Sequence, residues 1–296
     1  MTTSATPTHA NTHPTSTHPT HSDATVYRMP ATPPLSEPRP ATRSRGDDAR
    51  TIGAALRSDW IKASTVRANR AILAVTLAGG LLVSWAVSVL VTDQVLTVAE
   101  VGFYWTSVSS MLAAIAGVLL FGSEVQHGTL AGAVTAGPAR WVFAFSNTLT
   151  AAVAGLLIGA TGLVAGFGGA VIAGLAAGDT SSLPATVSWA LLFTTLSAVL
   201  GLGIGMIVRH STGAIAGFLV WGYVVENLVK LFLAEEAARF LPFVAGNHLL
   251  AYNSDLESAH ALAIALTRPE NAAVFGGYAA AALAIGTVLL YRRDAD

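Results

Sequence analysis

The chain has 296 residues, of which 53% are hydrophobic and only 11% are charged, and its mean hydropathy is +0.58. A soluble domain carries about 25% charged residues, so this composition excludes an ordinary soluble protein and predicts a membrane protein. The formal net charge of −1 favours no class of partner, and the absence of cysteine excludes disulfide scaffolds, thiolate metal sites and cysteine nucleophiles.

Residues 1–46 are rich in Thr, Pro, Ser and His and contain no apolar core. Such a segment buries too little apolar surface to offset its conformational entropy, so we expect a disordered tail. Its histidines could be read as a metal-binding tract, but a solvated tail of biased composition is the better interpretation. They are His9, His13, His18 and His21.

Residues 47–70 differ from the tail, because apolar residues recur there at helical spacing among basic ones. A basic amphipathic helix with an interfacial tryptophan tends to lie in the plane of the lipid head groups. We therefore expect an interfacial helix on the cytoplasmic side, with Trp60 and Lys62 against the membrane. The alternative is an ordinary cytosolic helix.

Six apolar runs are each long enough for a transmembrane helix, which needs about 20 residues. The predicted fold is therefore an all-α polytopic membrane protein, with the six-span domain over residues 71–293. The runs are 71–91, 103–121, 141–177, 184–208, 213–233 and 272–290.

The third run is too long for a simple span, because it would form about 55 Å of helix against a hydrocarbon core of about 30 Å. Charge placement decides how often it crosses. With the N-terminus inside and one pass per run, only three of the 16 basic residues lie outside: Lys230, Arg239 and Arg268. The positive-inside rule therefore predicts one long or tilted pass, and both termini in the cytoplasm.

Glycines spaced four residues apart occur in three of the runs, and such stripes allow close helix packing in lipid. The pairs are Gly155/Gly159, Gly162/Gly166, Gly201/Gly205 and Gly213/Gly217. Residues 234–271 contain only short apolar pieces, which we expect to form external or partly re-entrant helices before the last span.

The sequence lacks common motifs for nucleotide binding, hydrolysis and nucleic-acid binding. It contains no G-x-x-x-x-G-K-[ST] phosphate-binding loop, no H-E-x-x-H, no G-x-S-x-G, and no basic patch interleaved with aromatics. We therefore expect no enzyme activity, no catalytic or metal site, no cofactor and no nucleic-acid partner.

Glu226 and Lys230 are four residues apart toward the outer end of the fifth run. Ionisable groups in a span are costly and usually face a bundle interior or a cavity. One interpretation is a translocation path or gate. The other is a mutually neutralising pair near the interface, with Lys230 extending to the head groups.

The stretch from Glu235 to Arg239, followed by His248, resembles the glutamate-arginine and histidine motifs of prenyl-endopeptidase-like membrane proteases. The arginine comes one residue too soon, and the family's later histidine/asparagine motif has no match in a span. We expect instead that Glu235 and Arg239 form a helix-surface ion pair.

A second resemblance covers about residues 50–293. Ser-Asp-Trp-Ile-Lys (58–62) resembles the E-W-x-K start of bacterial ABC-2-type transporter permeases, although Asp59 replaces the usual glutamate. Glu-Val-Gln-His-Gly-Thr-Leu (124–130), followed by Gly-Pro-Ala-Arg (137–140), resembles the segment after the second span of those proteins.

This resemblance implies a permease subunit of an ATP-driven transporter in the cell membrane, exporting a drug-like, lipid-like or amphiphilic substrate. Two separate ATPase subunits would bind ATP and Mg²⁺, and a second permease subunit, identical or related, would complete the path among membrane lipids. The residues implied in ATPase docking are Glu124, His127, Gly128, Thr129, Pro138 and Arg140. The alternative from another class is a stand-alone channel or a structural membrane protein.

Overall fold

The structure is a computed structural model that describes residues 67–92, 94–126, 140–250, 260 and 263–293. The chain divides into two units, Met1–Thr42 and Arg43–Asp296, and all described residues belong to the second. The predicted tail and most of the predicted interfacial helix, including Trp60 and Lys62, lie outside the described residues.

The described part of the chain is helical and contains no strand, and six of its helical segments are long and apolar enough to cross a membrane. The prediction of an all-helical membrane protein with six transmembrane helices is therefore confirmed. In chain order the spans are α2 (Arg67–Leu90), α4 (Thr106–Gln126), α6 (Arg140–Ile172), α7 (Leu183–Val208), the composite of α8 (Ser211–Val220), π-helix η1 (Trp221–Val225) and α9 (Glu226–Phe232), and α13 (Arg268–Arg293).

In the described segments between the spans lie three short helices: α3 (Val98–Val101), α10 (Glu235–Ala238) and α11 (Pro242–His248). The short helices expected before the last span are thus present. They differ from each other, since α10 has no buried residue whereas α11 buries four.

The long third run is one continuous helix, α6, of 33 residues, as the charge distribution predicted. It ends at Ile172 because Gly174 follows in the left-handed conformation, with φ of 83°. The Gly174 N–H donates to the Val171 carbonyl and the Leu175 N–H to the Ala170 carbonyl, which is a Schellman-type ending that glycine accommodates without strain.

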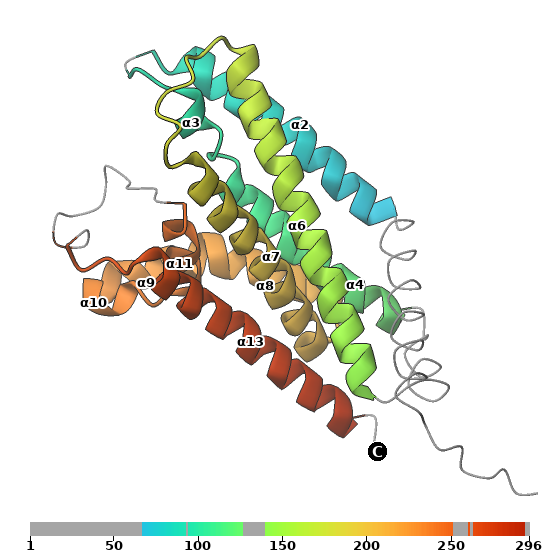
Figure 1. Cartoon of the computed structure of the whole chain (residues 1–296). Helices are drawn as coiled ribbons and strands as arrows, with labels where there is room; N and C mark the ends of the chain where they lie inside the picture. The colour runs from blue at the N-terminus through green and yellow to red at the C-terminus, as the bar shows by residue number, and fades with distance from the viewer. Residues whose placement is uncertain (1–66, 93, 127–139, 251–259, 261–262, 294–296) are drawn as a thin grey trace, which may run out of the picture. The chain divides into compact units, whose positions relative to one another are not determined.

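One end of the bundle, which we call the α11 end, holds α3, α10, α11 and the connection between α6 and α7 (Figure 1). The Val98 N–H donates to the Ala176 carbonyl at 2.9 Å, and the Arg268 guanidinium donates to the Thr186 hydroxyl at 3.1 Å. The first contact joins α3 to the segment after α6, and the second joins the start of α13 to the start of α7.

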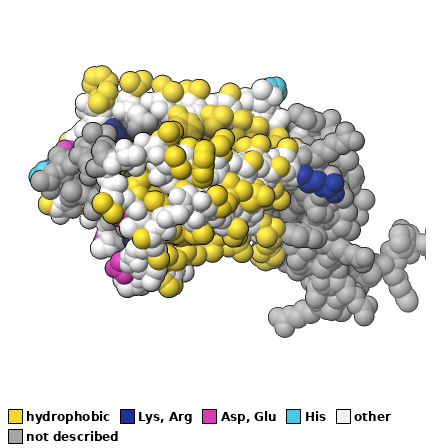
Figure 2. Space-filling model, turned by 90° about the horizontal axis from the view of Figure 1, so that it is seen from above, with side chains coloured by type: hydrophobic (Ala, Val, Ile, Leu, Met, Phe, Trp, Pro, Cys, Tyr) yellow, Lys and Arg dark blue, Asp and Glu magenta, His cyan; other side chains and the backbone are white. Residues whose placement is uncertain are grey.

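The opposite end, which we call the Arg209 end, holds the two-residue turn between α7 and α8. Gly122 in α4 lies against Ser211 in α8, and Leu290 packs with Phe121. The six described spans therefore run from one of these ends to the other (Figure 1). The surface agrees: in the face that Figure 2 shows, hydrophobic side chains cover the middle and charged ones lie toward the two ends.

Small residues bring the central helices together. A Cβ at Gly201 would overlap the Ala114 carbonyl oxygen, and one at Gly117 would overlap the Ala198 carbonyl oxygen, so α4 and α7 pack backbone against backbone. Close packing is confirmed for three of the four predicted glycine pairs. It is wrong for Gly213/Gly217, because a Cβ at Gly217 would meet nothing within 4 Å.

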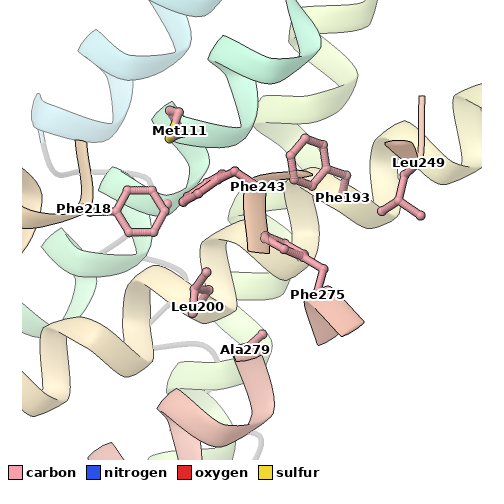
Figure 3. Packing of buried hydrophobic residues seen from close by; sticks show 9 residues of the cluster. Met111, Phe193, Leu200, Phe218, Phe243, Leu249, Phe275 and Ala279 are labelled. Atoms are coloured by element: carbon pink, nitrogen blue, oxygen red, sulfur yellow. The ribbon is translucent and has the colours of Figure 1, made fainter. Parts of the chain in front are cut away.

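The α11 helix inserts an aromatic side chain into the bundle (Figure 3). Phe243 is only 4% exposed, and its ring centroid lies 5.3 Å from that of Phe218 on α8 and 6.2 Å from that of Phe275 on α13. Phe275 in turn meets Phe193 of α7 edge to face at 5.1 Å. Four separate helices thus share one aromatic core, and α11 is a structural part of it.

Candidate functional site

Glu226 is the buried carboxylate of the fifth span, with only 2% of its surface exposed. A charged group is costly to bury unless it is paired or hydrogen-bonded. Its position and its partners therefore need a structural explanation.

The π-helix η1 turns Glu226 inward. In a regular α-helix, four residues turn about 40° more than one full turn. Glu226 follows Phe218 by eight residues, so in a regular helix its side chain would point about 80° away from the buried face on which Phe218 lies. A π-helix closes its hydrogen bonds to the fifth residue and so takes about one more residue per turn. Here the Glu226 N–H bonds to the Trp221 carbonyl, which keeps Glu226 on the same buried face as Phe218 and Gly222.

The partners of the Glu226 carboxylate are backbone N–H groups of α11. Val244 donates to Oε1 at 2.6 Å and Phe243 donates to Oε2 at 3.1 Å. The first N–H groups of a helix have no partner within the helix, and a negative charge is favourable at that end. Pro242 starts α11 and has no N–H to satisfy. Glu226 therefore accepts hydrogen bonds from the next two N–H groups, those of Phe243 and Val244.

Lys230 lies one turn beyond Glu226 but does not form a salt bridge with it: within the described part of the chain, no ion pair of 4.0 Å or less joins the two. The Lys230 charge still acts on the Glu226 carboxylate over this longer distance, so the interpretation as a mutually neutralising pair stays a prediction. The other interpretation, a role in a translocation path or gate, also stays a prediction.

Both residues line a cavity of about 350 Å³, which we call the Glu226 cavity. Its walls come from α4, the fifth span and α11, so it lies at the α11 end. The Ser107 hydroxyl donates to the Asn247 side-chain oxygen at 2.5 Å and thereby joins α4 to α11 across it. Met111 and Phe243 supply an apolar part of the wall.

Of the predicted ATPase-docking residues only Glu124 and Arg140 are described, and both lie at the opposite, Arg209 end. The structure places Glu124 in the last turn of α4 and Arg140 at the first position of α6, which describes their backbone only. The other four residues, His127, Gly128, Thr129 and Pro138, lie outside the described residues. Their docking role stays a prediction.

The residues of the protease resemblance are arranged differently from the prediction. Glu235 Oε2 lies 2.8 Å from His260 Nδ1, while Arg239 donates to the Ile264 carbonyl at 2.9 Å, so the predicted Glu235–Arg239 ion pair is wrong. The helix α10 ends at Ala238 after one turn, which leaves Arg239 at its C-cap and directs it to another segment.

His248, the histidine of that resemblance, lies on α11 and lines the Glu226 cavity, apart from the Glu235–His260 pair. Among the described residues, no group of three or more His, Asp or Glu side chains could hold a metal ion.

Sequence reasoning missed the bond between Glu226 and α11. The short run from Leu241 to Phe243 carried the available signal, since proline at the first position of a helix is common. The pairing itself could not be read, because the donors are main-chain groups that every residue but proline carries.

No protein-family model matches the chain, and no curated protein matches it.

Proposed function

We propose that this chain is the permease subunit of an ATP-driven, ABC-2-type transporter that exports a drug-like, lipid-like or amphiphilic substrate. The observation that carries the proposal is the Glu226 cavity. A buried carboxylate and a lysine line a polar cavity at one end of six apolar helices, and ionisable groups within spans mark substrate or ion pathways.

The energy source would be a separate ATPase. The sequence has no phosphate-binding loop of its own. Most basic residues of the described segments lie at the Arg209 end, which the positive-inside rule assigns to the cytoplasm. They are Arg67, Arg70, Arg140, Arg209, Arg292 and Arg293. The connection from Glu124 to Arg140 starts and finishes at that end, where an ATPase could bind it.

The proposal is tested by reconstituting the chain with candidate ATPase subunits in liposomes and measuring ATP-dependent transport. Replacing Glu124 by alanine should weaken ATPase association about ten- to hundredfold, because a hydrogen bond to a charged group contributes about 1.5–3 kcal/mol. Glu235→Ala, at the α11 end, is the matched control and should leave association unchanged.

Two results would contradict the proposal. One is solute flux through the chain alone without any ATPase, which favours a channel. The other is a normal Glu124→Ala variant together with an inactive Glu235→Ala variant, which favours the protease.

A further inference from the structure

The polar groups of the Glu226 cavity fall into two sets according to whether the protein already satisfies them. The carboxylate of Glu226 accepts two backbone N–H groups, and the side-chain oxygen of Asn247 accepts the Ser107 hydroxyl. These two acceptors of the cavity are therefore engaged by the protein itself.

The Ser107 and Ser110 hydroxyls and the Asn227 amide also donate within the protein, but three other donors of the cavity do not. Among the described residues, no hydrogen bond or ion pair is made to the Lys230 ammonium, the Tyr223 hydroxyl or the NH₂ group of Asn247. All three side chains line the cavity. A lysine ammonium carries three donors and an amide NH₂ carries two. The cavity can therefore donate several hydrogen bonds to a ligand that carries acceptor atoms.

We propose that the Glu226 cavity binds the phosphate or carboxylate group of an amphiphile, with Lys230 as its counter-charge. Charge-assisted hydrogen bonds from an ammonium to phosphate or carboxylate are the strongest that these donors can form. The volume of about 350 Å³ falls within the range of about 300–1,000 Å³ that small-molecule sites occupy.

The surroundings favour an amphiphile over a free anion. Met111 and Phe243 give the cavity an apolar wall. Beside Lys230, α9 exposes Leu228, Leu231 and Phe232, which are 53%, 76% and 89% exposed. A ligand with its anionic group at Lys230 can therefore lay its apolar part along α9, whereas inorganic phosphate gains nothing from that surface.

Glu226 acts in this site as a positioning residue. Its carboxylate is held by α11, so it does not neutralise Lys230 by direct contact, and it keeps the wall that carries Asn247 in place. Describing the ligand as the transported substrate rests on the proposed function, but binding itself requires no ATPase.

The test therefore uses the full chain alone, purified in a neutral detergent. The probe is a short-chain phosphatidylglycerol, with inorganic phosphate and a phosphate-free glycoside of the same chain length as comparisons. Binding is measured by isothermal titration calorimetry. We expect saturable binding of the phospholipid and binding at least about tenfold weaker for each comparison, because each lacks one of the two contacts.

Variants test whether Lys230 binds the ligand. Lys230→Gln should weaken phospholipid binding about tenfold or more, and Lys230→Arg should restore most of it, since arginine keeps the charge. Arg292→Gln removes an exposed base at the Arg209 end and should leave binding unchanged. Because Lys230 is exposed, thermal unfolding of the variant should match that of the parent chain.

Three results would overturn the proposal: equal losses for Lys230→Gln and Arg292→Gln, phosphate binding as tight as the phospholipid, or glycoside binding as tight as the phospholipid. The first shows unspecific charge attraction, the second a plain anion site, and the third a site that ignores the anionic group. None of these results bears on ATPase association, so the proposed function is judged separately.

Discussion

The Glu226 carboxylate in the fifth span accepts the Val244 N–H at 2.6 Å, and thereby joins a transmembrane helix to a short helix 18 residues further along the chain. The same carboxylate accepts the Phe243 N–H, and Phe243 inserts into the aromatic core. The polar bond and the apolar contact therefore hold α11 against the bundle from two sides.

Removing the carboxylate should loosen α11. Glu226→Ala leaves two N–H groups without their acceptor, at a cost of about 1–3 kcal/mol for each group that stays buried. Glu226→Gln keeps one acceptor oxygen and should lose about half as much. Thermal unfolding in detergent measures this, with Glu236→Ala as the control because Glu236 is exposed at 60%. Equal melting temperatures for Glu226→Ala and the parent chain would refute the capping role.

Glycine-to-alanine substitutions should destabilise the chain where the glycine packs against another helix, and should not where it does not. Gly201→Ala forces a Cβ onto the Ala114 carbonyl and should destabilise the chain by about 1–3 kcal/mol. Gly217→Ala meets nothing within 4 Å, so it should be neutral, or stabilising by up to about 1 kcal/mol through helix propensity. The melting temperatures of the two variants check this, and a reversed order would show that the α4–α7 contact is wrong.

The turn at the Arg209 end depends on His210. Its Nδ1 accepts the Gly213 N–H at 3.0 Å and so caps α8. His210→Ala should cost about 0.5–2 kcal/mol, while His210→Asn should keep most of the stability, because asparagine is a good N-cap residue. Chemical denaturation compares the two variants, and equal losses in both would argue against the cap.

Single cysteines should report the orientation of the bundle, because the chain has none of its own. The positive-inside rule predicts that a cysteine at Gln126 is protected from an impermeant thiol reagent in intact cells. A cysteine at Glu236, at the α11 end, should be labelled. The reverse labelling pattern would invert the predicted topology.

Much of the fold could be predicted from local properties of the sequence. Hydropathy and length identify the six spans, since each apolar run must satisfy its backbone hydrogen bonds within its own helix. The distribution of basic residues also predicted that α6 crosses once, because charge placement constrains the number of passes. The sequence likewise indicated that Glu226 and Lys230 were unusual, as ionisable residues in an apolar run.

Tertiary structure alone decided what these residues contact. The π-helix η1 sets the direction of Glu226, and the position of α11 supplies its donors, neither of which the hydropathy of the fifth span encodes. The same holds for glycine: the stripes at Gly201 and Gly217 look alike in sequence, yet only Gly201 faces another helix. Spacing determines which residues share a face of a helix, but the packing of distant segments determines what that face meets.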